Sequence, residues 1–401
     1  MQARAVLEAP PSPMIGQARL LRAAFEGADM VALAQHIASR ANNGMVEAGA
    51  ALDLATIFLL LHRFEEALKL QNDVLQSHQH FMLRSNVPGA RTRVLVIAAP
   101  GDLMANTPID FLLDDPAFSV EYLFVLPGRE APRQLPDHDA VIVGVAYSRA
   151  HEPILEALSE AAAHWLRPVI NHPRHVLRTS RHGIAEALAD APGILVPRVV
   201  RAGRVDLLAE GGALPEGFEF PVLVRPVDTH AGNDLRKIED SATLREAIHG
   251  TGADEIYLTE FCDYRDADGL FRKYRIALID GAPFLCHMAI RDHWMIHYLN
   301  AGMLEDPDKR AAEAAAMRTF DQDFALRHQE AFAEMHRRLG LDYVVMDCAE
   351  SHDGRLLIFE ADTGMVVHDM DSADMFPYKP PQMRKVFKAF QQALSERCRF
   401  V

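Results

Sequence analysis

The chain has 401 residues, of which 49% are hydrophobic and 24% are charged. These proportions are ordinary for a globular protein, and the length predicts two or three domains. The net charge of −15 argues against a nucleic-acid backbone or an anionic membrane surface as the main partner. The four cysteines have neither zinc-ligand nor redox spacing, and the N-terminus lacks the apolar core of a signal peptide. We therefore expect a cytoplasmic protein without nucleic-acid or membrane partners.

Residues 1–90 have apolar positions at helical spacing and predict an all-helical region. The segments that carry this pattern are "ARLLRAAFEGADMVALAQHIASRA", "AGAALDLATIFLLLHRF" and "FEEALKLQNDVLQSHQHFML". The stretch "HRFEEALKLQNDVLQ" resembles the second half of a tetratricopeptide repeat, whose surface binds proteins or peptides. A plain helical cap on the next domain is the favoured alternative.

Residues 91–172 alternate between strand and helix patterns and predict an α/β domain. Residues 94–98 are a continuous apolar run typical of a buried parallel strand, and "TPID" places Thr107 as the N-cap and Pro108 as the first residue of a helix. Ligands of such sheets lie beyond the carboxyl ends of the strands, so Asn106 and Thr107 are candidate substrate contacts. An ordinary loop and helix cap is equally consistent with these residues.

Residues 173–401 follow a different order and predict an α+β module. Strand patterns occur in "LVPRVVRAG", "FPVLVRP", "EIYLTEFCD", "FRKYRIALIDG" and "APFLCHMAI". The stretch "SATLREAIHG" is helical, and one long amphipathic helix is expected at about 308–339. The strands "YVVMDCAE" and "RLLIFEAD" form a closing hairpin across the turn "SHDG".

Three carboxylates in this hairpin are expected to converge. Glu360 and Asp362 are two positions apart and so point to one face of their strand, and Asp347 reaches that face from the paired strand. Clustered carboxylate oxygens suit Mg2+ or Mn2+, with phosphate oxygens completing the coordination. A solvated hairpin face is the alternative, but it leaves Glu360 unexplained within the apolar run "LLIF".

The order "FPVLVRP", a glycine-containing turn, "YLTEFCD" and then "YVVMDCAE…LLIFEAD" resembles the ATP-grasp ligases, the superfamily of glutathione synthetase and D-alanine:D-alanine ligase. The resemblance covers about residues 90–375. It implies a pre-ATP-grasp α/β domain at 91–172 and an ATP-grasp domain at 173–401, with a lid at about 190–262 and a C-terminal subdomain at about 263–401. The all-α helical region would precede them.

The resemblance also implies ATP and Mg2+ or Mn2+ as cofactors. The metal ligands would be Asp347, Glu360 and Asp362, the last in place of the family's usual Asn. Arg225 stands where the family usually has a phosphate-binding Lys, and Gly232 lies in the turn that closes over the phosphates. The adenine and ribose contacts would be Glu260, Phe261, Cys262 and one of Asp263 and Asp268.

Two arginines are candidate catalytic residues. Arg275 in "RKYRIAL" resembles an Arg that points into the family's active site, and Arg291 lies close to Tyr298 and Asn300, which are candidate substrate contacts. Either arginine would stabilise charge on a phosphoryl group in transfer or bind a substrate carboxylate.

The implied activity is that of an ATP-dependent carboxylate–amine ligase that forms an amide or peptide bond through an acyl-phosphate and releases ADP and phosphate. Its partners would be a small-molecule or peptide carboxylate and an amine acceptor. Two alternatives stay open: an ATP-dependent phosphotransferase, and a nucleotide-binding module without ligase activity. A homodimer, and a protein or peptide partner for the N-terminal helices, are further expectations.

Overall fold

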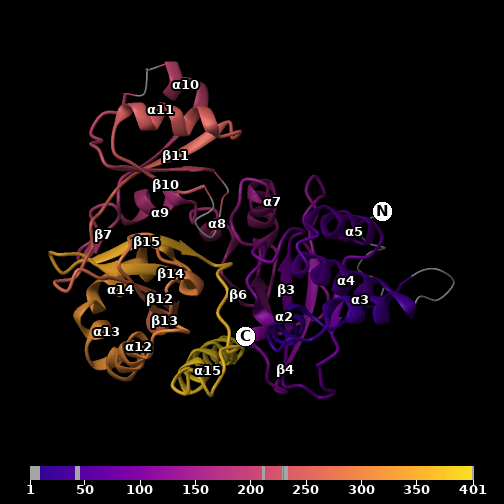
Figure 1. Cartoon of the computed structure of the whole chain (residues 1–401). Helices are drawn as coiled ribbons and strands as arrows, with labels where there is room; N and C mark the ends of the chain where they lie inside the picture. The colour runs from indigo at the N-terminus through magenta and orange to yellow at the C-terminus, as the bar shows by residue number, and fades with distance from the viewer. Residues whose placement is uncertain (1–9, 41–45, 210–212, 228, 230–233, 400–401) are drawn as a thin grey trace. The chain divides into compact units, whose positions relative to one another are not determined.

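The computed structural model describes residues 10–40, 46–209, 213–227, 229 and 234–399. The chain divides into two compact units (Figure 1). Unit 1 comprises residues 1–177, 340–345 and 362–401, and unit 2 comprises residues 178–339 and 346–361. In the described ranges, no helix is both long enough and apolar enough to cross a membrane.

Unit 1 is built on a six-stranded sheet in the order β1-β2-β4-β3-β5-β6. Strand β3 pairs in parallel with β4 and with β5, and β5 pairs in parallel with β6. The α/β pattern expected from residue 91 onward is thus confirmed for these strands. The strands are β1 (Ser12–Met14), β2 (His80–Leu83), β3 (Thr92–Ala98), β4 (Phe118–Phe124), β5 (Ala140–Val143) and β6 (Val169–Ile170).

The prediction that residues 1–90 are all helical is wrong, because β1 and β2 belong to this sheet. Strand β2 pairs antiparallel with β4, and β1 pairs in parallel with β2. Phe81 on β2 is fully buried and meets the ring of Phe124 edge-on, with 5.7 Å between centroids. Pairing with β4 and burial of Phe81 favour a strand here over a continued helix.

Helices of unit 1 surround α4, which is apolar on nearly every side. Its residues Ala50, Leu54 and Ile57 form a core cluster with Leu20 and Met30 from the preceding helices. The tetratricopeptide resemblance stays a prediction. The helices of unit 1 are α2 (Gln17–Phe25), α3 (Met30–Ser39), α4 (Ala48–Leu60), α5 (Phe64–Ser77), α6 (Ile109–Leu112), α7 (Glu152–Ala162), α8 (Pro173–Val176) and α15 (Lys379–Cys398).

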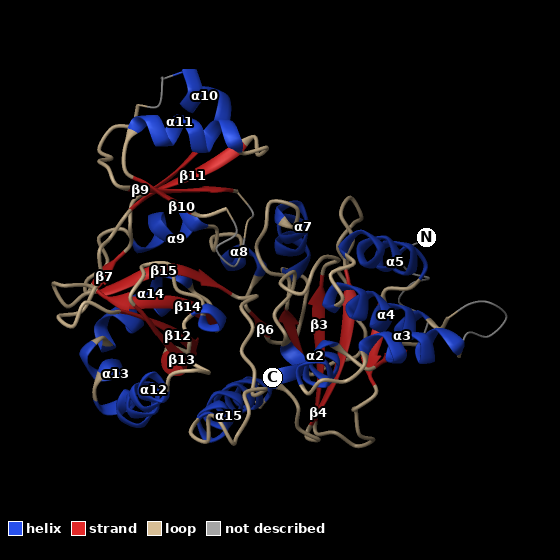
Figure 2. Cartoon of the chain, in the orientation of Figure 1, coloured by secondary structure: helices blue, strands red, loops and turns tan. Residues whose placement is uncertain are grey.

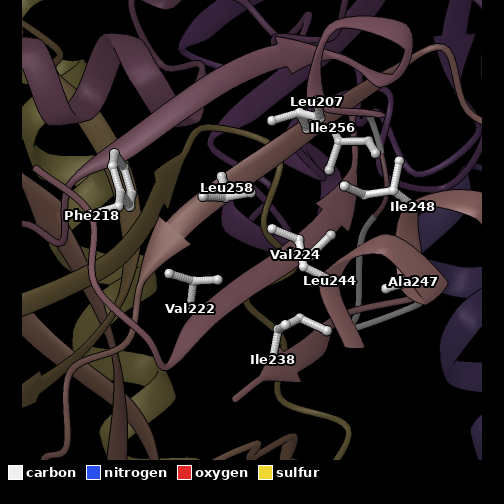
Figure 3. Packing of buried hydrophobic residues seen from close by; sticks show 10 residues of the cluster. All are labelled: Leu207, Phe218, Val222, Val224, Ile238, Leu244, Ala247, Ile248, Ile256 and Leu258. Atoms are coloured by element: carbon white, nitrogen blue, oxygen red, sulfur yellow. The ribbon is translucent and has the colours of Figure 1, made fainter. Parts of the chain in front are cut away.

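Unit 2 contains a four-stranded antiparallel sheet in the order β10-β9-β11-β8. Figure 3 shows its core, in which Val222, Val224 and Leu258 of the sheet face Leu244 and Ile248 of α11. The residues of α11 coincide with the predicted helical stretch, and its N-cap Asp240 accepts a hydrogen bond from the backbone N–H of Thr243. The elements are β8 (Val199–Gly203), α10 (Arg204–Ala209), β9 (Val222–Pro226), β10 (Arg236–Ile238), α11 (Ser241–Gly250) and β11 (Glu255–Glu260).

The second sheet has five strands in the order β13-β12-β14-β15-β7. Helix α9 lies between the two sheets of unit 2 in the view of Figure 2. The bounds are α9 (Arg181–Leu188), β7 (Ile194–Leu195), β12 (Phe271–Ile279), β13 (Ala282–Arg291), β14 (Tyr343–Glu350) and β15 (Leu356–Asp362). Strand β14 begins in unit 1 and continues in unit 2, and Asp362 at the end of β15 belongs to unit 1.

The long helix predicted at 308–339 is broken, which corrects that expectation. Asp323 has non-helical dihedral angles, φ −120° and ψ −87°, and the buried rings of Phe320 and Phe324 stack on either side of it. Burial of both rings thus accompanies the break in the helix. The helical pieces, with the short 3-10 helix before them, are η1 (Tyr298–Asn300), α12 (Pro307–Thr319), η2 (Phe320–Gln322), α13 (Phe324–Arg327) and α14 (Gln329–Leu339).

Candidate functional site

A cavity of about 130 Å³ lies in unit 2, where β9 and β11 of the four-stranded sheet face β12, β14 and β15 of the five-stranded sheet. One part of its lining is apolar and another part is charged. The apolar lining residues are Pro197, Leu223, Leu235, Phe261, Cys262, Tyr264, Trp294, Met295, Ile296 and Phe359. The charged or titratable ones are Arg181, Arg225, Glu260, Lys273, His297, Asp347 and Glu360.

Asp347 is the most deeply buried acid of this cavity, with 1% of its surface exposed. Lys273 donates to its Oδ2 at 2.8 Å, and Arg275 donates to Oδ1 at 2.8 Å and to Oδ2 at 3.1 Å. Burial by itself raises the pKa of Asp347, but the two cations outweigh burial and hold that pKa well below its usual range. Asp347 is therefore a permanently ionised carboxylate between two cations.

Glu360, on β15, is a second acid of this cavity and is partly exposed. Arg181, the first residue of α9, forms an ion pair with its Oε2. Burial raises the pKa of Glu360, and the positive charges of Arg181, Lys273 and Arg225 reverse that effect, so that the pKa lies below its usual value. Asp347 and Glu360 are thus ionised carboxylates of the cavity, and each is held by at least one cation.

Arg225 is the third cation of the cavity and is only 6% exposed. Its Nε donates to Thr229 Oγ1 at 3.2 Å, and its Nη2 donates to the backbone oxygen of Thr229. Burial and the neighbouring Arg181 lower the pKa of Arg225 to about 10. The lowered pKa reflects the cost of burying the charge of Arg225, and an anionic ligand would compensate that charge.

The apolar part of the cavity contains two aromatic rings in contact. Phe261 meets Trp294 edge-on with 5.9 Å between centroids, and Lys237 lies 4.1 Å from the centroid of the Phe261 ring. Burial, together with the charge of Glu260, raises the pKa of the Cys262 thiol to about 11. Cys262 is therefore a neutral wall of the cavity and not a nucleophile.

Six of the predicted site residues line this one cavity, although they come from four different strands or strand ends. Arg275, predicted as catalytic, is not a lining residue of the cavity but forms an ion pair with the lining residue Asp347. The six are Arg225, Glu260, Phe261, Cys262, Asp347 and Glu360.

The other predicted residues of unit 2 are not among its lining residues, and each has a local partner. Asp263 is paired with Arg265, and Asp268 is paired with Arg272. Arg291 donates to the backbone oxygen of Met295 at 3.5 Å, Tyr298 donates to Glu313 Oε2 at 2.8 Å, and Asn300 accepts from the backbone N–H of His297 at 2.9 Å.

The remaining predicted residues lie in unit 1 or outside the described residues. Asn106 exchanges two hydrogen bonds of 2.8 Å with the backbone of Ala99, and Thr107 donates to the backbone oxygen of Gly144 at 3.2 Å. Thr107 precedes the N-cap of α6, which is Pro108, so its predicted capping role is wrong by one position. Asp362 accepts a hydrogen bond from the backbone N–H of Gly364. Gly232 lies outside the described residues.

A divalent metal fits Asp347 and Glu360 as a partial ligand set. Within the ranges described, no three Asp, Glu, His or Cys side chains lie close enough together to hold a metal by themselves. Mg2+ usually takes one or two protein carboxylates and completes its octahedron with water and substrate phosphate oxygens. Asp347 and Glu360 would supply the two protein carboxylates, and the three cations beside them would bind the phosphate oxygens.

Sequence reasoning missed Lys273 and Arg181. Lys273 is two positions before Arg275 on β12, and side chains two positions apart on a strand point to the same face. Lys273 could have been predicted from Arg275 in this way. Arg181 opens α9, where the helix dipole disfavours a cation, and an arginine at such a position indicates a partner elsewhere. Lys273 binds Asp347, and Arg181 binds Glu360.

No protein-family model matches the sequence, and no curated protein matches it either. Among solved structures, a RimK-domain ATP-grasp protein of Sphaerobacter thermophilus DSM 20745 is similar at 15% identity and a TM-score of 0.42, over 75% of this chain and 98% of that one. The VanG D-Ala:D-Ser ligase of Enterococcus faecalis is similar at 13% identity and a TM-score of 0.47, over 75% of this chain and 99% of that one. The D-alanine–D-alanine ligase of Bacillus anthracis is similar at 13% identity and a TM-score of 0.43, over 77% of this chain and 100% of that one. These similarities concern the fold.

Proposed function

We propose that the protein is an ATP-dependent carboxylate–amine ligase. One observation carries the proposal: the cavity of unit 2 joins an aromatic, apolar part to a charged part. There Lys273 pairs with Asp347, Arg181 pairs with Glu360, and Arg225 is a third cation. A purine nucleotide with a metal-bound polyphosphate has the same division into an apolar base and a charged end. The order of motifs that resembles the ATP-grasp ligases supports the same assignment.

The charged residues have complementary roles in this proposal. Lys273 and Arg181 exchange their carboxylate partners for phosphate oxygens, and Arg225 offers its planar fork to the same oxygens. Asp347 and Glu360, released from these cations, hold Mg2+ or Mn2+, which supplies charge neutralisation at the phosphates. Lys273, Arg181, Asp347 and Glu360 would thus each exchange one opposite charge for another, so their charges stay compensated, and Arg225 would gain an anionic partner.

The proposed chemistry needs no nucleophile from the protein. A substrate carboxylate oxygen attacks the γ-phosphorus of ATP, the bond to the β,γ-bridging oxygen breaks, and ADP leaves. The amine nitrogen of the acceptor then attacks the acyl carbon, phosphate leaves with the acyl oxygen, and the amine proton passes to solvent. Arg275 keeps Asp347 in place through their ion pair. The substrates would be a small-molecule or peptide carboxylate and an amine, in the cytoplasm.

Nucleotide binding is testable with an intrinsic probe. The chain has two tryptophans, Trp165 in unit 1 and Trp294 in the cavity of unit 2. In a Trp165→Phe background, ATP with Mg2+ should change the Trp294 emission in a saturable way. Lys273→Met and Arg225→Met should each weaken binding about 10-fold or more. Arg337→Met is the matched control because Arg337 is 65% exposed and forms an ion pair with Glu334, away from the cavity lining.

The reaction type is tested by product analysis. A screen of carboxylates and amines for phosphate release should find a pair that yields ADP and phosphate. With the carboxylate alone, reversible acyl-phosphate formation should move the β,γ-bridging oxygen of labelled ATP into non-bridging positions. AMP and pyrophosphate as products would refute the proposal. A stable phosphorylated product without an amine would favour the phosphotransferase, and binding without any turnover would favour the nucleotide-binding module.

A further inference from the structure

Unit 1 contains a cavity of its own, of about 70 Å³. Ala98 and Phe124, the last residues of the parallel strands β3 and β4, contribute to its lining. Helices α4 and α5 line it with Thr56 and Gln71, so the cavity lies between the carboxyl edge of the sheet and the N-terminal helices. The carboxyl ends of parallel strands are the usual place for ligands of α/β units.

Two buried carboxylates line this cavity. Asp53 of α4 is 2% exposed and Asp110 of α6 is 7% exposed. Asp53 accepts hydrogen bonds from the backbone N–H of Ile15 at 2.8 Å and of Gly16 at 3.2 Å, and Asp110 accepts one from the N–H of Ala18 at 2.6 Å. The hydrogen-bond donors that reach them from other described residues are thus all backbone groups.

No Lys, Arg or His is among the lining residues of the cavity. The charge of Arg84 lowers the pKa of Asp53, and the charge of Arg22 lowers the pKa of Asp110, in both cases without an ion pair. Arg22 forms its ion pairs with Asp114 and Asp369 instead. Burial accordingly raises the pKa of Asp53 and of Asp110 to about 6. At neutral pH both carboxylates are ionised without a contacting cation.

Capping of helix α2 explains only part of this negative charge. The N–H groups that donate hydrogen bonds to the two carboxylates belong to the start of α2 and to the residues just before it. A helix N-terminus is equivalent to about +0.5 of an elementary charge, so two ionised carboxylates leave about −1.5 uncompensated in a buried cavity. A bound cation of one charge would offset most of this negative charge.

We propose that this cavity binds the protonated amino group of a small primary amine, with Asp53 and Asp110 as its two carboxylate partners. An ammonium has three N–H donors for the carboxylate oxygens, and Leu52, Leu59 and Phe124 offer an apolar wall to the alkyl part of the amine. The volume is more than twice the roughly 30 Å³ that one water molecule takes in the liquid, so a single water does not fill it. A divalent metal fits less well: the exposed Asp102 also lines the cavity, but no three Asp, Glu, His or Cys side chains of the described residues lie close enough together to hold a metal ion. The proposal does not rest on the nucleotide chemistry of unit 2.

The test uses the full-length protein without nucleotide and propylammonium as the probe, followed by saturation-transfer NMR at constant ionic strength. We expect saturable binding of propylammonium. Tetramethylammonium has no N–H donor, so it should bind at least about 10-fold more weakly. Asp53→Asn and Asp110→Asn should each weaken propylammonium binding about 10-fold or more, since asparagine keeps the acceptor oxygen but not the charge. Asp137→Asn is the matched control, because Asp137 is an exposed acid of unit 1 that pairs with Arg93.

A second variant separates loss of binding from loss of fold. Thr56→Leu fills the cavity from α4 and leaves both carboxylates in place, so it should remove propylammonium binding while far-ultraviolet circular dichroism stays unchanged. Equal binding of tetramethylammonium and propylammonium would overturn the proposal, because charge alone would then explain the binding. Undiminished binding in the Asp53→Asn/Asp110→Asn double variant, or no saturable binding to the unmodified protein, would overturn it as well.

Discussion

Lys273 and Asp347 form an ion pair between the neighbouring strands β12 and β14 of unit 2, with 2.8 Å between Lys273 Nζ and Asp347 Oδ2. Arg275 binds the same carboxylate, so removal of the acid leaves two partly buried cations without it. Asp347→Asn should therefore lower the free energy of unfolding by about 3 kcal/mol or more, measured by urea denaturation with Trp294 as the probe. Asp268→Asn, which breaks an exposed pair with Arg272 and keeps an acceptor oxygen for the backbone N–H of Leu270, should change it by less than about 1 kcal/mol. Equal effects of the two variants would contradict this account.

Glu360 and Asp362 should differ in their importance for turnover. Glu360→Gln removes one of the two carboxylates that the cavity offers to a metal, so activity should fall at least about 100-fold with the fold unchanged. Asp362→Asn introduces the residue that the resembling family usually has and should cost much less. The measurement is the rate of ADP release with a substrate pair that supports turnover. Full activity of Glu360→Gln would show that this residue holds no metal.

The stability of unit 1 should decrease as the pH rises from about 4 to about 6. The folded-state pKa of Asp53 and of Asp110 is raised from 3.8 to about 6, so protons bind the folded chain more tightly and their stabilising effect is lost as the pH rises through that value. Each group contributes on the order of 2–3 kcal/mol to this change. Asp110→Asn should reduce the pH dependence and raise the stability at pH 7.

The readout for this pH dependence is Trp165 fluorescence during urea denaturation, in a Trp294→Phe background. Asp137→Asn serves as the control: its carboxylate is exposed, and the hydrogen bond with Arg93 lowers its pKa. An unchanged pH profile in Asp110→Asn would contradict the assignment of the raised pKa to this residue.

The N-terminal strand β2 should contribute as much to the stability of unit 1 as the central strands of its sheet do. Phe81→Ala removes a fully buried ring on β2 and should destabilise unit 1 by about 3–5 kcal/mol. Phe64→Ala, on the 51% exposed Phe64 of α5, should cost less than about 1 kcal/mol. Thermal unfolding followed through Trp165 distinguishes the two. A small effect of Phe81→Ala would mean that residues before 90 form a separate helical layer after all.

Elements with a strong local pattern were predictable from the sequence. Helix α11 has the cap residue Asp240, a clear period and exposed polar positions, so local propensity and tertiary packing agree. Strand β2 has four residues and follows directly on a helical pattern, and its conformation depends on pairing with the distant β4. The break at Asp323 depends in the same way on where Phe320 and Phe324 are buried. Such tertiary effects have no local signature.

The candidate site was predictable where residues recur at short spacing. Asp347 and Glu360 line one cavity as the hairpin pattern indicated, because alternation along a strand decides the face of each side chain. Lys273 had the same kind of signal through Arg275 but was not singled out. Arg181 lies 179 positions from its partner Glu360, and no local pattern connects residues that far apart.

The way β14 passes from one unit to the other has a consequence for the order in which the protein can fold during synthesis. Unit 2 is complete only when residue 361 has been made, and unit 1, whose first strand is Ser12–Met14, still requires helix α15. At roughly 5–20 residues per second, the early strands of unit 1 wait on the order of tens of seconds for that helix. Unit 1 therefore cannot fold to completion before all of unit 2 has been synthesised, and a ribosome stalled before residue 340 would expose the unfinished cores of both units.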